Sequence, residues 1–113
     1  MATLITAVVR HHSLDDVKTA LQGIDVAGMT VTEVTGFGRQ GGRTETYRGA
    51  EYKLEFLPKI KVEVIVADEQ VTEVEDAIVA AARSGRIGDG KVWSIPLGGL
   101  TRIRTGEKGD AAC

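Results

Sequence analysis

Apolar side chains recur along this chain with two periods, one typical of strands and the other of helices. Residues 4–10 form a short, apolar and partly β-branched run, which predicts a buried strand. Ser13 is then a suitable N-cap for a helix, whose apolar stripe is Leu14, Val17, Leu21 and Ile24. Residues 29–34 are rich in Val and Thr and predict a second strand.

The second half of the chain repeats this order of elements. Apolar residues alternate with charged ones over residues 60–66, as in a strand with one buried face. Asp68 is a suitable cap for a second helix, whose apolar stripe is Val71, Val74, Ile78 and Ala81 or Ala82. A last strand over residues 92–95 ends at Pro96.

Two strand–helix–strand units in tandem are typical of an α+β, ferredoxin-like sandwich with the order βαββαβ. We therefore expect an antiparallel four-stranded sheet with both helices on one face. The strands carry apolar residues on both sides, so the other face would be a large apolar patch if it stayed uncovered. Burial by further copies of the same chain is the economical solution.

The hydrophobic pattern stops between the second and third strands. Residues 37–55 mix glycine with Arg, Glu and Tyr, and a loop of this length is usually functional in a compact domain. At 113 residues, the chain is expected to form one domain over residues 1–113. We expect that domain to carry this loop, a glycine-rich turn at 83–91 and a C-terminal loop at 98–113.

Composition narrows the function classes. The formal net charge of −2 does not favour nucleic acid as a partner. No apolar stretch approaches the roughly 20 residues that cross a bilayer, and the start lacks signal-peptide features, so we expect a cytoplasmic protein without membrane insertion. Cys113 is the single cysteine, which excludes an intrachain disulfide.

Residues 83–108 depart from this near neutrality, because they hold six basic and two acidic side chains. Within them, Gly88-Asp89-Gly90-Lys91 offers glycines that let backbone N–H groups converge on an anion, and a lysine for phosphate oxygens. Arg102 and Arg104 lie two residues apart, so on an extended segment both would point to one side. This pattern indicates a polyphosphate site; a solvated basic turn is the alternative.

Two other patterns carry less weight. Residues 36–41 match G-x-G-x-x-G, but no helix follows them, as a dinucleotide site would require. His11 and His12 are adjacent, so in an extended backbone they would face opposite ways and would not share one metal ion.

Several segments together resemble the PII nitrogen-regulatory signal-transduction proteins. Residues 47–52, Tyr-Arg-Gly-Ala-Glu-Tyr, are similar to the loop signature of that family. Residues 36–40, 85–92 and 102–107 are similar to its other motifs, and Ser84 keeps the hydroxyl of a frequent threonine. The resemblance implies a non-enzymatic homotrimer that binds ATP or ADP between subunits and controls nitrogen assimilation through the shape of its loop.

The resemblance also implies roles for individual residues. Phosphates would be held by Gly88, Asp89, Gly90 and Lys91 of one subunit and by Arg102 and Arg104 of its neighbour. The adenine would lie near Thr30 and Ile65, and the site would be closed by Gly36, Gly38, Arg39 and Gln40. Mg-ATP would then recruit 2-oxoglutarate, with the Gln40 side-chain oxygen in the Mg²⁺ shell and Lys59 on the distal carboxylate.

Tyr52 matches the tyrosine that many PII proteins have uridylylated or adenylylated, although it would also serve as an anchor that packs on a partner. The resemblance implies an ammonium channel, a nucleotidylyltransferase or a nitrogen-metabolism enzyme as the partner. Departures from the family pattern are Arg10-His11 for Lys-Pro, Gly41 for lysine and Arg43 for histidine.

Two other functions use the same cleft. One is slow ATP hydrolysis, which is disfavoured because Asp89 is the only carboxylate in the phosphate turn. The other is a PII-like sensor of another adenyl nucleotide or of bicarbonate, against which the intact loop signature argues.

Overall fold

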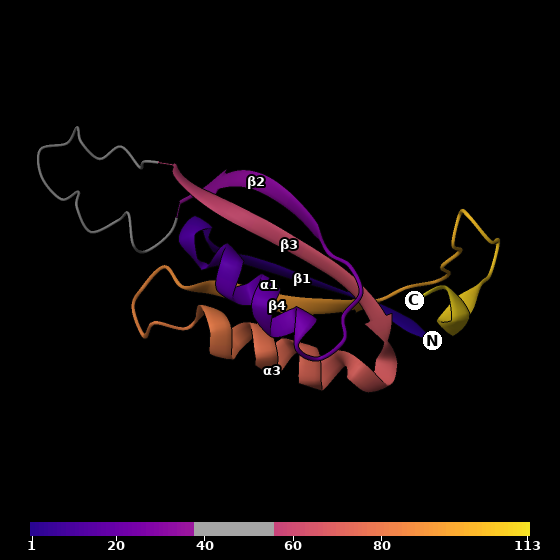
Figure 1. Cartoon of the computed structure of the whole chain (residues 1–113). Coiled ribbons are helices and arrows are strands. Elements are labelled where there is room, and N and C mark those ends of the chain that lie inside the picture. The colour runs from indigo at the N-terminus through magenta and orange to yellow at the C-terminus, as the bar shows by residue number, and fades with distance from the viewer. Residues whose placement is uncertain (38–55) are drawn as a thin grey trace, which may run out of the picture.

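The computed structural model describes residues 1–37 and 56–113 and has a four-stranded sheet with helices packed on it (Figure 1). The strands are β1 (Ala2–Arg10), β2 (Thr30–Gly36), β3 (Leu57–Ala67) and β4 (Gly90–Pro96). The α-helices are α1 (Leu14–Gln22) and α3 (Val71–Ala82). Short 3₁₀ turns are η1 (His11–Ser13), η3 (Asp68–Gln70) and η4 (Gly109–Ala112).

The sheet has the strand order β2-β3-β1-β4, and every neighbouring pair is antiparallel. Both α-helices lie on the same side of it (Figure 1). The predicted α+β, ferredoxin-like fold is therefore confirmed. Neither α1 nor α3, nor any other described helix, has the length and apolar character that crossing a bilayer requires.

The core lies between the sheet and the helices. Alternate residues of β1 and β3 point toward the helices, as the strand period of two requires. The apolar side chains that form the core, from these strands and from the helices, are at most 6% exposed. The core residues of the strands are Ile5, Ala7, Val9, Ile60, Val62, Val64 and Val66, and those of the helices are Val17, Leu21, Val74 and Ile78.

The opposite face of the sheet carries an apolar row that the described residues leave uncovered. Leu4 pairs with Ile65 of β3 and with Ile95 of β4, and the same face presents Trp93 opposite Thr6. Ile65 of the inner strand β3 is 39% exposed, and Trp93 and Ile95 of the edge strand β4 are 42% and 50% exposed, so the row leaves a large apolar surface open. This row is the uncovered patch that the strand pattern predicts.

The helix starts differ from the prediction, because neither Ser13 nor Asp68 caps its helix through the side chain. Both helices are entered through a 3₁₀ turn, and Ser13 has helical φ and ψ of −88° and −5° instead of the extended backbone of an N-cap. The Asp68 carboxylate accepts a hydrogen bond of 2.6 Å from the hydroxyl of Thr3 instead. It thereby ties the end of β3 to the start of β1.

Candidate functional site

A turn between α3 and β4 depends on glycine for its shape. Gly85, Gly88 and Gly90 have φ of +86°, +101° and +108°, which side chains rarely adopt. At Gly90 a Cβ atom would lie 1.9 Å from the carbonyl oxygen of Val8, so β4 approaches β1 more closely than any other residue would allow. Several backbone amides of this turn donate within it, among them that of Asp89 to the carbonyl of Arg86 at 3.3 Å.

The carboxylate of Asp89 points back into the turn. Oδ2 accepts hydrogen bonds from the backbone N–H groups of Ser84, at 2.7 Å, and Gly85, at 2.8 Å. Oδ1 accepts one from the Ser84 hydroxyl. The Ser84 hydrogen bonds, with smaller contributions from Gly85 and the Arg10 charge, lower the pKa of Asp89 to about 2. Asp89 is thus ionised near neutral pH, and its oxygens accept hydrogen bonds from within the turn.

Two cationic side chains at the ends of neighbouring strands donate hydrogen bonds to carbonyl groups of the turn. Arg10 and Lys59 are directly paired across β1 and β3. Arg10 Nη2 donates to the carbonyl of Ile87 at 2.8 Å, and Lys59 Nζ donates to that of Gly88 at 3.0 Å. Burial and the adjacent Arg10 charge lower the pKa of Lys59. An arriving anion would relieve the repulsion between these two cations.

Arg10 also faces Asp89. Its Nε lies 3.4 Å from Asp89 Oδ1, and the two side chains are 22% and 21% exposed. Among the described residues this Nε has no partner in hydrogen-bond geometry, so the contact is one of charge. Sequence reasoning noted Arg10 as a departure and did not assign it to the site. Its one signal was a charge at the end of an apolar strand.

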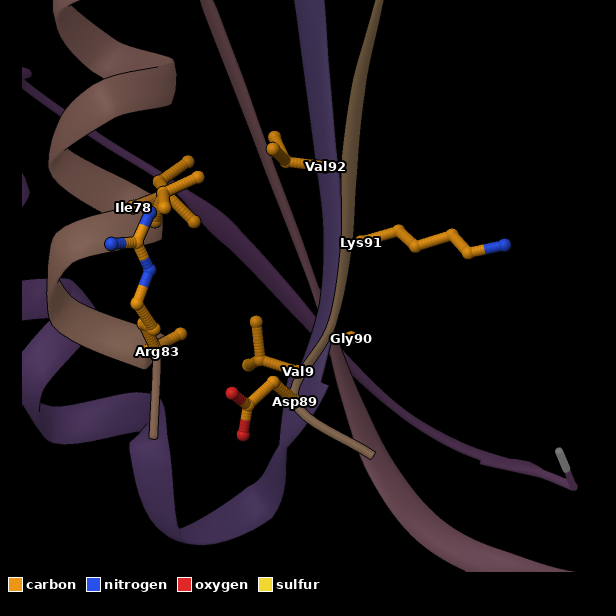
Figure 2. A pocket seen from close by; sticks show the side chains of 9 residues that line it. Val9, Ile78, Arg83, Asp89, Gly90, Lys91 and Val92 are labelled. Carbon is orange, nitrogen blue, oxygen red and sulfur yellow. The ribbon is translucent and has the colours of Figure 1, made fainter. Parts of the chain in front are cut away.

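Lys91 projects from β4 to the uncovered face of the sheet. Figure 2 shows it pointing away from a pocket on the helix side, toward which Val9, Asp89 and Val92 point. That pocket, between α3 and β4, has a volume of about 210 Å³. It is small for a nucleotide, since ligand pockets usually exceed about 300 Å³. An anion that meets both the turn and Lys91 would lie on the opposite side.

Other predicted residues lie on the same uncovered face or at its edge. Thr30 pairs with Glu63, which places it diagonally from Ile65, and both are exposed. Gly36 ends β2 opposite Leu57. Beyond it, Phe37 packs edge-to-face on Phe56, with ring centroids 5.4 Å apart.

Predictions for Gly38, Arg39, Gln40 and Tyr52, and for the loop at 37–55 beyond its first residue, lie outside the described residues. His11 and His12 lie within them, but in the 3₁₀ turn η1 and not in extended backbone as predicted. Their rings meet edge-to-face, with centroids 5.5 Å apart.

The segment with Arg102 and Arg104 is a closed turn, so the prediction of an extended backbone there is wrong. The N–H of Gly106 donates to the carbonyl of Arg102 at 2.8 Å. Arg102 donates to Glu107 Oε1 at 3.0 Å and to the Cys113 carbonyl at 3.3 Å, while Arg104 is exposed. Glu107 also accepts hydrogen bonds from the Thr105 hydroxyl and, through its carbonyl, from the Arg102 N–H, so it helps to close the turn.

The two basic regions do not meet within one chain. The α3–β4 turn precedes β4 and the C-terminal segment follows it, so the length of the strand separates them. Figure 1 shows them at opposite ends of the sheet, the turn in orange and the C-terminal segment in yellow.

Comparison with known proteins shows which family the chain is similar to. Residues 2–107 match the family model described as Nitrogen regulatory protein P-II. The chain belongs to the P-II family. It is 56% identical to a P-II protein of Microchaete diplosiphon and 52% identical to P-II 1 of Escherichia coli K12, in each case over 96% of both chains.

A solved P-II structure has the same fold. The crystal structure of Arabidopsis thaliana PII bound to citrate matches with a TM-score of 0.81 and 35% identity, over 98% of this chain and 91% of that one. The family resemblance of the sequence motifs is therefore confirmed. The P-II assignment also places the protein among nitrogen regulators.

Proposed function

We propose that this P-II chain acts as a homotrimeric, cytoplasmic sensor of ATP or ADP and of 2-oxoglutarate, and regulates nitrogen-assimilation proteins through its loop at 37–55. The observation that carries the proposal is the split of anion-binding groups between two ends of the sheet. The glycine turn with Lys91 lies at one end, and the segment with Arg102 and Arg104 lies at the other. Only another copy of the chain would bring the two halves together.

The uncovered sheet face supports the same assembly. Ile65, Trp93 and Ile95 leave an apolar surface that burial against other copies would remove from water. Association through this face would also bring Lys91, Thr30 and Ile65 to a boundary between subunits. The single domain over residues 1–113 would then act as one third of a larger unit.

In this trimer the nucleotide would lie between two subunits. The amides of Gly88 and Gly90 and the Lys91 ammonium would hold phosphates, and Arg102 and Arg104 of the adjacent copy would complete the site. Thr30 and Ile65 would contact the adenine. Gly36, with Gly38, Arg39 and Gln40, would close the site from the base of the loop.

Mg²⁺ would accompany ATP and 2-oxoglutarate. Among the described residues no three His, Cys, Asp or Glu side chains are grouped to hold a metal, and the Asp89 oxygens are hydrogen-bonded within the turn. This arrangement fits a Mg²⁺ ion bound mainly through phosphate oxygens and water, with Gln40 as its protein ligand. The metal would reduce the repulsion between two anionic ligands.

Lys59 would pair with the distal carboxylate of 2-oxoglutarate. The citrate bound to Arabidopsis PII supports a carboxylate effector, because citrate is also a multivalent carboxylate. Lys59 lies beside the turn through its contact with Gly88, so a ligand there would be adjacent to the phosphates. We assign Tyr52 as a nucleotidylylation site on the loop. The expected partners are an ammonium channel, a nucleotidylyltransferase or a nitrogen-metabolism enzyme.

We infer regulation, not catalysis, from the state of Asp89. It is the only carboxylate in residues 83–91, and its hydrogen bonds to Ser84 and Gly85 leave it unsuited to act as a general base. Steady-state phosphate release faster than roughly 1 s⁻¹, a typical enzyme rate, would contradict this inference.

Isothermal titration calorimetry tests the effector assignment. With Mg-ATP present, the protein should bind 2-oxoglutarate, and Lys59→Ala or Gln40→Ala should weaken that binding by roughly tenfold or more, because a charged partner or a metal ligand is lost. Lys18→Ala, an exposed change on α1, is the matched control. Unchanged binding in both site variants would refute the site, and an unmodified protein that ignores adenine nucleotides would refute the function.

A further inference from the structure

We propose that Asp89 is a positioning residue that closes the α3–β4 turn from within and contacts neither the nucleotide nor its metal. We call the contacts of Asp89 with Ser84, Gly85 and Arg10 the clamp. The existence of the clamp rests on the described geometry alone, whereas its effect on ligand binding rests on the proposed nucleotide function. It replaces the sequence-based expectation that Asp89 holds phosphates directly.

The first argument is the use of the carboxylate oxygens. An ionised carboxylate offers about four acceptor positions. Oδ2 takes the N–H groups of Ser84 and Gly85, and Oδ1 takes the Ser84 hydroxyl and faces Arg10 Nε at 3.4 Å. A phosphate-bound metal would have to displace one of these donors. The residues that Asp89 already serves lie five and four positions before it, so its bonds close a ring of the chain.

The second argument is what the ring encloses. Gly85 and Gly88 make the backbone of this segment flexible. If the turn were open before binding, an anion would have to order it, and the lost conformational entropy would weaken binding. Four contacts to one side chain remove that freedom in advance. The clamp therefore fixes the backbone around Gly88 and Gly90 before a ligand arrives.

The third argument is charge. A carboxylate beside a triphosphate would repel it, unless the carboxylate is turned away and neutralised. Asp89 meets both conditions, since Arg10 faces it and its oxygens point back toward Ser84. Arg10 in turn donates to the Ile87 carbonyl, so the same cation fixes the turn at a second point. Arg10 thus both neutralises Asp89 and stabilises the shape of the turn.

Binding measurements separate a clamp from a metal ligand. Dissociation constants for Mg-ATP, metal-free ATP and ADP should be measured for Asp89→Asn, Ser84→Ala and the double variant. Asn keeps one acceptor oxygen, but its NH₂ group would face the N–H and O–H donors of the turn and could not accept from them. We therefore expect the affinity for all three ligands to fall by a similar factor, roughly tenfold. Ser84→Ala should weaken them in the same uniform way, and the double variant should be no worse than the worse single variant.

Controls make these results specific. Ser84→Thr keeps the hydroxyl and should bind like the unmodified protein, while Asp76→Asn removes an exposed carboxylate of α3 and should change nothing. If Asp89→Asn instead abolishes only the gain in affinity that Mg²⁺ provides, Asp89 is a metal ligand and the proposal is wrong. It is also wrong if Ser84→Ala binds normally while Asp89→Asn does not.

Amide hydrogen exchange tests the clamp without any ligand. The Ser84 and Gly85 amides should be protected in the unmodified protein and should exchange at least roughly tenfold faster in Asp89→Asn, because their acceptor is lost. Equal exchange in the two proteins would overturn the clamp. Failure of the unmodified protein to bind adenine nucleotides would overturn the proposed function, and the exchange result would still decide the role of Asp89.

Discussion

Gly90 shows how one position controls the approach of two strands. Its backbone has φ of +108°, and a Cβ atom there would lie 1.9 Å from the Val8 carbonyl oxygen. The constraint acts on both the end of β1 and the start of β4. Because Arg10 follows on β1 and Lys91 on β4, the glycine sets the spacing of charged groups on both sides of the turn.

Gly90→Ala should lower the free energy of unfolding by about 2–4 kcal/mol, because the new methyl group meets backbone and the φ is strained. Urea denaturation measures the change. Gly98→Ala is the matched control, since nothing lies within 4 Å of a Cβ there and its φ is ordinary. Equal midpoints for the two variants would show that β4 can retreat from β1 at little cost.

The depressed pKa of Asp89 makes a second prediction, on acid stability. A carboxylate with a lowered pKa stabilises the folded state above its unfolded value of 3.8, and this stabilisation disappears as the pH falls toward about 2. The comparison is with Asp89→Asn, in which this contribution is absent, so that the effect of this one carboxylate is isolated. The urea midpoints of the two proteins should converge between pH 4 and pH 2. A constant difference would contradict the prediction.

At the scale of elements, α3 joins the core to the turn. Its residue Ile78 is 2% exposed in the core, and its last turn leads through Arg83 directly into Ser84. The position of the helix on the sheet therefore sets where the turn begins.

Ile78→Ala should destabilise the protein by about 3 kcal/mol, through lost burial and the cavity left behind. Thermal or urea unfolding measures the loss, and Thr72→Ala on the exposed side of the same helix should change stability little. A small effect at Ile78 would mean that α3 repacks into the vacated space.

The elements were predictable from sequence to different degrees. Alternation over residues 60–66 and the stripe of α3 identified their elements because the burial of one face imposes a period. Capping was predicted wrongly, since 3₁₀ turns at Ser13 and Asp68 depend on how each strand joins its helix. The site required the register that sets Arg10 beside Lys59 and the direction of the Asp89 carboxylate, and local patterns contain neither.

At the scale of the whole molecule, the apolar row on the uncovered face supports the proposed assembly of several copies of the chain. We expect the unmodified protein to have the mass of three chains by light scattering. Trp93→Glu should shift it toward a single chain, because a buried unpaired charge at the interface is costly. Val31→Glu, on the helix side of β2 and 40% exposed, is the control. A monomeric unmodified protein would refute the assembly.

The separation of the glycine turn from Arg102 along the length of β4 has a consequence for mixtures. Suppose that each nucleotide cleft contains the turn of one copy and the arginines of the next copy. A copy that lacks Arg102 would then impair binding only in the one cleft to which it would have contributed this arginine. A cell that makes both intact and defective chains would then hold hybrid rings whose remaining clefts still respond. The loss of function caused by such a mutation would therefore increase with the fraction of defective chains, and the mutation would not be dominant-negative.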